Sequence, residues 1–155
     1  MLNCNQLHQQ LETVSNRHSK LTAKFQSFAK YVEEQVTHEA FRIKGITVSL
    51  HIEDGYFTVA FAGRALRFTF SSVPFENGLL VGNVTCVLMK DFPEKLFVHV
   101  GEFTFAGNGK TNLVAPDDVD SIIIDDDISA LYIALNFIHE SLVKDGLHNT
   151  RSDVH

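Results

Sequence analysis

The chain has few cysteines and prolines, no tryptophan and no long hydrophobic run. Its two cysteines, Cys4 and Cys86, are too few for a disulfide framework or a four-cysteine zinc site, so we expect free thiols in a reducing cytoplasm. No apolar stretch approaches the ~18 residues of a membrane span. The first residues also lack the basic and apolar segments of a signal peptide. The sequence therefore predicts a cytoplasmic protein that does not contact membranes.

The short motifs of the common enzyme classes are also missing. Residues 107–111, Gly-Asn-Gly-Lys-Thr, resemble the end of a Walker A loop, but Thr104 stands where that loop needs its first glycine. The Asn-Gly pair predicts a turn instead. The sequence contains no HExxH and no GxSxG motif. We therefore expect a protein without catalytic activity, and a hydrolase with an atypical site is the least favoured interpretation.

The charge is unevenly distributed. The net charge of the 155 residues is −6, and the stretch 114–155 holds nine acidic and two basic residues. An acidic third argues against nucleic-acid binding, which needs clustered Lys and Arg, and it suits a protein partner with basic character. Asp125–Asp127 stand where a helix is expected to begin and can cap it. Asp117, Asp118 and Asp120 are expected in a solvated loop, as a surface for that partner. Their spacing does not match a calcium loop, so we expect no metal and no cofactor.

The first segment predicts a long amphipathic helix from about residue 4 to residue 38. Apolar residues recur there at alternating spacings of four and three, with one histidine among them, and no Pro or Gly interrupts residues 5–40. The members of this seam are Leu7, Leu11, Val14, His18, Leu21, Phe25, Phe28 and Val32. We expect the seam to pack on the protein's own sheet, and a coiled coil is the alternative.

A meander of strands follows the helix. Alternating apolar residues over 46–52, 57–61 and 66–70 predict three strands, joined by turns at Asp54-Gly55 and Gly63-Arg64. We expect Leu50 to pair with Val59, and Val59 with Phe68. The opposite side of these strands carries His51, Thr58, Arg67 and Thr69, and we expect it to face solvent or to contact a partner or a small anion.

A second hairpin is predicted over 79–89 and 96–106. The expected register sets Leu88 opposite Phe97 on the core side, and Cys86 opposite His99, a pair that could form a thiolate site but has no third group to orient it. The other side would then expose six apolar residues: Val81, Val87, Met89, Leu96, Val98 and Val100. A large exposed apolar patch is rare on a soluble monomer, so we predict a homodimer through this surface.

A C-terminal helix is predicted from Asp125–Asp127 to Gly146, after a short strand-like run at 121–124. The expected fold is α+β, with a long N-terminal helix, an antiparallel meander of about five strands and a C-terminal helix in one domain, 1–146, followed by a loose tail, 147–155. A helix held by a curved meander resembles the layout of type III secretion chaperones, small acidic α+β dimers. Those proteins place a helix between the third and fourth strands, where this chain has only the segment 72–78.

Two functions follow from these features. The first is a non-enzymatic protein-binding module, an immunity-like or chaperone-like accessory factor. Its expected contact residues are Asp117, Asp118, Asp120, Val87, Met89 and Val98. The alternative is a small-molecule binding protein with an apolar pocket between helix and sheet. Its expected lining residues are Phe57, Phe61, Phe68, Phe70, Phe97 and Phe103.

Overall fold

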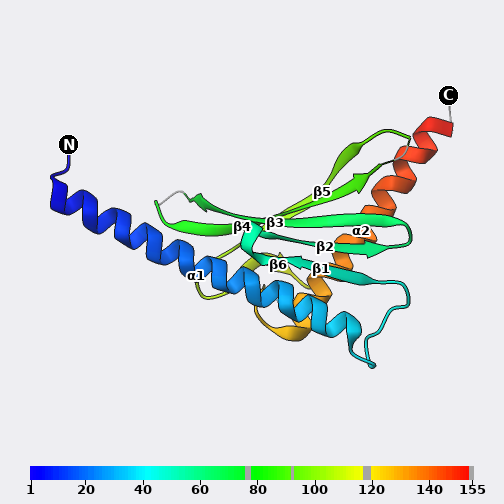
Figure 1. Ribbon diagram of the computed structural model, residues 1–155, viewed down its shortest axis with the longest axis horizontal. Coiled ribbons are helices and arrows are strands. Elements are labelled where there is room, and N and C mark those ends of the chain that lie inside the picture. The colour runs from blue at the N-terminus through cyan, green and yellow to red at the C-terminus, as the bar shows by residue number, and fades with distance from the viewer. Residues whose placement is uncertain (76–77, 92, 117–119, 154–155) are drawn as a thin grey trace.

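A computed structural model describes the backbone of residues 1–75, 78–91, 93–116 and 120–153, with side chains up to residue 144. The elements in chain order are α1 (Cys4–Thr37), β1 (Thr47–His51), β2 (Tyr56–Phe61), β3 (Arg64–Pro74), β4 (Leu80–Lys90), β5 (Leu96–Phe105), β6 (Lys110–Val114), β7 (Ser121–Ile123) and α2 (Asp127–Asp153). The strands form one antiparallel meander in which each neighbour in sequence is a neighbour in space (Figure 1). The α+β prediction is confirmed, with seven strands in place of about five.

The core is a layer of aromatic rings between the sheet and the two helices. Phe28 of α1 lies with its ring centroid 5.5 Å from Phe57 and 5.9 Å from Phe103. Phe137 of α2 reaches the same strands, 5.9 Å from Phe68 and 5.8 Å from Phe103. Both helices therefore cover one face of the sheet and pack beside each other, and no helix in the described residues covers the other face.

The N-terminal helix agrees with its sequence pattern. It spans Cys4–Thr37 and begins with a capping box, in which the Asn3 side chain accepts from the Gln6 backbone N–H while the Gln6 side chain accepts from the Asn3 N–H. This arrangement satisfies two of the backbone donors that a helix start leaves unpaired. The first turns of α1 extend beyond the ends of the strands (Figure 1).

The first two hairpins differ from the predicted register by two residues. Leu50 pairs with Phe57, because residues 52–54 form a 3-10 turn that closes on Gly55, whose φ is 78°. The next turn is Ala62–Gly63, one residue earlier than predicted, and both of its residues have positive φ. A shift of two leaves every side chain on its predicted face, so the large apolar residues still enter the core.

The second hairpin differs by one residue, and this changes which side chains are buried. The closing pair is Lys90 and Leu96, so the loop is one residue longer than predicted. A shift of one turns the side chains near the start of β5 to the opposite face, and a β-bulge at Cys86 and Val87 leaves Phe103 and Phe105 on their predicted core side. The prediction that Val98 and Val100 point away from the core is therefore wrong: Val100 is buried in the core and Val98 packs against it. Phe97 instead points outward and is 71% exposed.

The C-terminal helix begins close to its predicted start and ends later. Asp126 caps it by accepting from the Ser129 N–H at 3.0 Å, and α2 then runs past Gly146 to Asp153. The prediction that the chain leaves the helix at Gly146 is thus wrong. One glycine inside a helix costs only about 1 kcal/mol relative to alanine, and it ends a helix only where the backbone turns left-handed.

Candidate functional site

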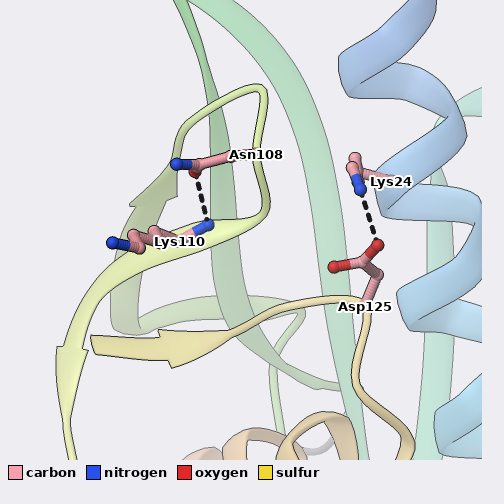
Figure 2. Close-up of polar contacts among 4 residues, drawn as sticks. All are labelled: Lys24, Asn108, Lys110 and Asp125. Carbon is pink, nitrogen blue, oxygen red and sulfur yellow. Dashed lines mark hydrogen bonds and ion pairs between the residues drawn. The ribbon is translucent and has the colours of Figure 1, made fainter. Parts of the chain in front are cut away.

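The Gly-Asn-Gly-Lys segment is a β-turn and has no phosphate-loop geometry. The Ala106 N–H donates to the Lys110 carbonyl and the Gly109 N–H to the Ala106 carbonyl, both at 2.9 Å. The Asn108 side-chain oxygen accepts from the Lys110 N–H at 3.0 Å (Figure 2). Lys110 therefore opens a strand and not a helix, and its side chain points away from Lys24 and Asp125 (Figure 2). Since a phosphate loop must open a helix, this segment lacks the donor arrangement that would cradle a nucleotide.

The first aspartate of the helix start joins α1 next to the turn, and the adjacent Ile124 N–H donates to the Gly109 carbonyl of the turn at 2.9 Å. Asp125 pairs with Lys24 of α1 at 2.7 Å, and each side chain keeps a quarter of its surface exposed (Figure 2). Gly109 has a φ of 88°, and a Cβ there would lie 2.5 Å from the Asp125 carboxylate. The glycine therefore lets the turn approach the ion pair. The predicted capping role falls mainly to Asp126, and Asp125 links the start of α2 to α1 through Lys24.

The remaining acidic residues do not form a cluster of ligands in the part of the chain that the structure describes. Asp120 is exposed beside β7, while Asp117 and Asp118 lie outside the described residues. Over the described ranges, no three His, Cys, Asp or Glu side chains come together as a metal site would require.

Cys86 does not lie opposite His99, contrary to the predicted pairing. Its partner on β5 is Gly101, while His99 pairs with Val87 and points to the other face. Burial raises the pKa of the Cys86 thiol from 9.0 to about 12, against the opposing effect of the Lys144 charge. A nucleophilic cysteine needs a lowered pKa and a nearby base, so this thiol is part of the core.

Most of the phenylalanines predicted to line a pocket pack against other side chains in the described structure, while Phe61 borders a surface pocket beside the β2–β3 turn. Phe57, Phe68 and Phe103 are almost fully buried, and the ring centroids of Phe57 and Phe68 stack 4.8 Å apart. Phe70 packs on Phe25 and Phe105, and Phe97 lies outside the core. An apolar cavity of about 270 Å³ lies elsewhere, between α2 and strands β6 and β7. Its lining residues are Leu113, Val114, Pro116, Ile122, Tyr132, Ile133, Asn136, Phe137 and Glu140.

Comparison with family models, curated proteins and solved structures gives no match for this chain. Neither helix, over its described residues, has an apolar stretch long enough to cross a membrane.

Two uncovered surfaces stand out in the described part of the molecule. The first is the free segment of α1, which we define as residues 4–14. Leu7, Leu11 and Val14 are 44%, 68% and 44% exposed there, whereas Leu21 in the same seam is completely buried. His18 marks the boundary, because its ring stacks on Phe70 and its Nδ1 lies 2.6 Å from the Ser72 hydroxyl. The seam is thus continuous in sequence, and the sheet covers only its second half.

The second surface is the open sheet face, the side of β1–β5 that carries no helix. Register and burial place the following residues on it: Thr47, Ser49, His51, Tyr56, Thr58, Ala60, Ala65, Arg67, Thr69, Ser71, Val73, Val81, Asn83, Thr85, Val87, Met89, Phe97, His99, Glu102 and Thr104. The predicted contact residues Val87 and Met89 lie on this face, and Val98 does not.

An aromatic and cationic ladder crosses three strands of the open sheet face. The His51 ring stacks on Tyr56 at 4.7 Å, and the Arg67 guanidinium lies 4.3 Å from the centre of the Tyr56 ring. The Nε of Arg67 is buried and has no hydrogen-bond partner. The alternation of residues in β1 and β3 was enough to predict that His51 and Arg67 share this face. Sequence reasoning missed their contact with Tyr56, and only the pairing of His51 with Tyr56 could have indicated it.

Proposed function

We propose that the chain is a non-enzymatic protein-binding module, an accessory factor of the immunity-like or chaperone-like kind, that holds a protein partner on the free segment of α1. The observation that carries this proposal is the exposure of Leu7, Leu11 and Val14 in a seam that is buried from Leu21 onward. A row of large apolar side chains on a helix is the usual donor surface for a hydrophobic groove or for a second amphipathic helix.

The free segment is ordered before a partner arrives. It is continuous with the buried half of α1 and is capped at Asn3, so its helical shape does not depend on the partner. Binding therefore avoids most of the ordering cost that a disordered segment would meet. Each of the three exposed apolar side chains can contribute about 1 kcal/mol when a partner covers the exposed half of its surface.

The chemistry of the segment favours an apolar partner surface. Glu12 is the only formally charged side chain between residues 4 and 14, and the other positions outside the seam are mostly Gln, Asn, His and Thr. Binding there should depend little on salt, because few ion pairs can form across the interface. A partner of basic character would meet the chain elsewhere, at the exposed carboxylates that include Asp120.

Affinity capture with a charge placed in the seam tests the proposal. Wild-type protein should retain a specific set of proteins from the native host, and Leu11→Glu should lose that set while keeping the wild-type circular dichroism spectrum and melting temperature. Gln10→Glu is the matched control, because it adds the same charge to the adjacent position outside the seam and should bind as wild type does. Equal capture by Leu11→Glu and wild type would show that the seam is not the binding surface.

The cavity between α2 and strands β6 and β7 supports a second candidate, the binding of a small apolar molecule. Tyr132, Asn136 and Glu140 supply polar groups to an otherwise apolar lining, an arrangement typical of ligand sites. Ligand-observed NMR with a library of small aromatic compounds tests this candidate. Binding that disappears when Ile133→Phe fills the cavity would support it, and the absence of any binder would remove it.

A further inference from the structure

We propose that two copies of this chain pack face to face through the open sheet face, with Arg67 of each copy bound to Glu102 of the other. This inference rests on the proposed protein-binding function, since it names a second copy as one of the partners, and it uses a different surface from the free segment of α1. The open face is large, continuous over five strands and uncovered by either helix in the described residues.

The formal charges of the open sheet face favour a second copy over an unrelated partner. Among its strand residues only Arg67 and Glu102 carry a formal charge at neutral pH, so the face is neutral on a chain whose net charge is −6. Two acidic chains repel each other over most of their surfaces, and a neutral face is where that repulsion is weakest. Its apolar members, Val87, Met89 and the outward-pointing Phe97, supply surface that can be buried.

Arg67 and Glu102 cannot satisfy each other within one chain. Arg67 of β3 pairs across the sheet with Val87 of β4, which pairs with His99 of β5. Glu102 of β5 pairs with Thr85 of β4, two residues along that strand from Val87. The two side chains are therefore separated by two strand spacings, about 10 Å, and by a further step along the strands. Neither makes an ion pair within the described part of the chain, and the buried Nε of Arg67 has no acceptor.

A two-fold axis resolves both unpaired charges at once. The axis lies in the plane of the interface, passes over β4 between Thr85 and Val87, and is perpendicular to the line that joins Arg67 and Glu102, so it is midway between these two residues. It brings the Arg67 of one copy against the Glu102 of the other, and the same operation forms the second, identical pair. The guanidinium lies over the Tyr56 ring, which itself stacks on His51, so the Arg67 side chain is held in one position before the copies meet.

Charge reversal tests this arrangement through oligomeric state. Wild-type protein should sediment as a dimer over a concentration series. Arg67→Glu and Glu102→Arg should each be folded, with dissociation constants raised at least about 100-fold, because each variant sets two pairs of like charges against each other. Mixing the two variants should restore a dimer, since the new carboxylate at position 67 then meets the new guanidinium at position 102, and the two native charges meet each other.

Three results would overturn the inference. They are a wild-type monomer at every concentration, single variants that still dimerise, or a mixture of variants that stays monomeric. Glu102 is exposed, so Glu102→Arg should fold even if Arg67→Glu does not. Val87 lies near the axis, so Val87→Glu is a third variant that should be monomeric. Leu11→Glu should remain a dimer. If Leu11→Glu is monomeric while the variants on the open sheet face still dimerise, the copies associate through α1 instead. If Leu11→Glu loses only the capture of host proteins and stays a dimer, the result bears on the proposed function and not on the dimer.

Discussion

Two identical substitutions in one helix should have very different effects on stability. Leu21 and Leu11 belong to the same seam of α1, but Leu21 is 0% exposed in the core and Leu11 is 68% exposed on the free segment. Leu21→Ala removes buried carbons and leaves a cavity among packed rings, so it should lower the free energy of unfolding by about 2–5 kcal/mol. Leu11→Ala loses only a third of the burial of one leucine, partly offset by the better helix propensity of alanine, and should cost less than about 0.5 kcal/mol.

Urea denaturation followed by circular dichroism measures both values. With a slope of about 2 kcal/mol per molar urea, Leu21→Ala should lower the midpoint by about 1–2.5 M, and Leu11→Ala by less than about 0.3 M. All proteins must be compared at one concentration, because dissociation of a dimer contributes to apparent stability.

A large cost for Leu11→Ala would refute the reasoning. It would mean that the free segment is covered in the purified protein. If that cost falls on dilution, a second copy provides the cover, and if it does not, α1 folds back on its own chain. The first outcome would also contradict the placement of the dimer interface on the open sheet face.

Three other predictions concern the site residues. Gly109→Ala should cost about 1–3 kcal/mol, because its φ is 88° and the added Cβ would lie 2.5 Å from an oxygen of Asp125. The matched Gly107→Ala, with no atom nearer than 3.9 Å, should cost less than about 0.5 kcal/mol by the same urea assay. Lys24→Met should cost about 1 kcal/mol, and a double-mutant cycle with Asp125→Asn should return most of that cost as coupling; a coupling of zero would show that the ion pair is not formed in solution. Burial raises the pKa of the Cys86 thiol from 9.0 to about 12, so proton release favours the unfolded chain: this group should not affect stability below about pH 9 and should lower it as the pH rises from 9 to 12. In thiol titration one of the two cysteines should react in the folded protein and both in urea, and rapid reaction of both thiols without urea would contradict the burial of Cys86.

The local parts of the fold could be predicted from the sequence because they depend on near neighbours along the chain. The seam of α1 defines a helix whose start and end agree with the structure within one residue. The alternation in β1–β3 places Phe57 and Phe68 on the core side even though the predicted register was displaced, because a shift of two preserves the face. The turn at residues 107–110 follows from Asn-Gly, which accepts positive φ.

The sequence could not predict which side chains near the start of β5 enter the core, because this depends on the length of the loop between β4 and β5. Both alternating sets of residues in β4 and β5 are apolar near the turn, so either register would bury hydrophobic side chains and the sequence offers no preference. The structure closes the loop at Lys90 and Leu96, which places Val98 inside and Phe97 outside. Side-chain packing across the whole core, including Phe137 of α2 against Gly101, selects this register.

The seam of α1 shows the same division between sequence and tertiary structure. Its period determines by itself that Leu7, Leu11, Leu21 and Phe28 lie on one side of one helix, since a helix of 3.6 residues per turn aligns spacings of three and four. Which of them are buried depends on how far the sheet extends along the helix, and that is set by strand lengths and by the contact at His18. Burial is a property of what lies across from a residue, so only the tertiary structure decided that half of a uniform seam is core and the other half is exposed.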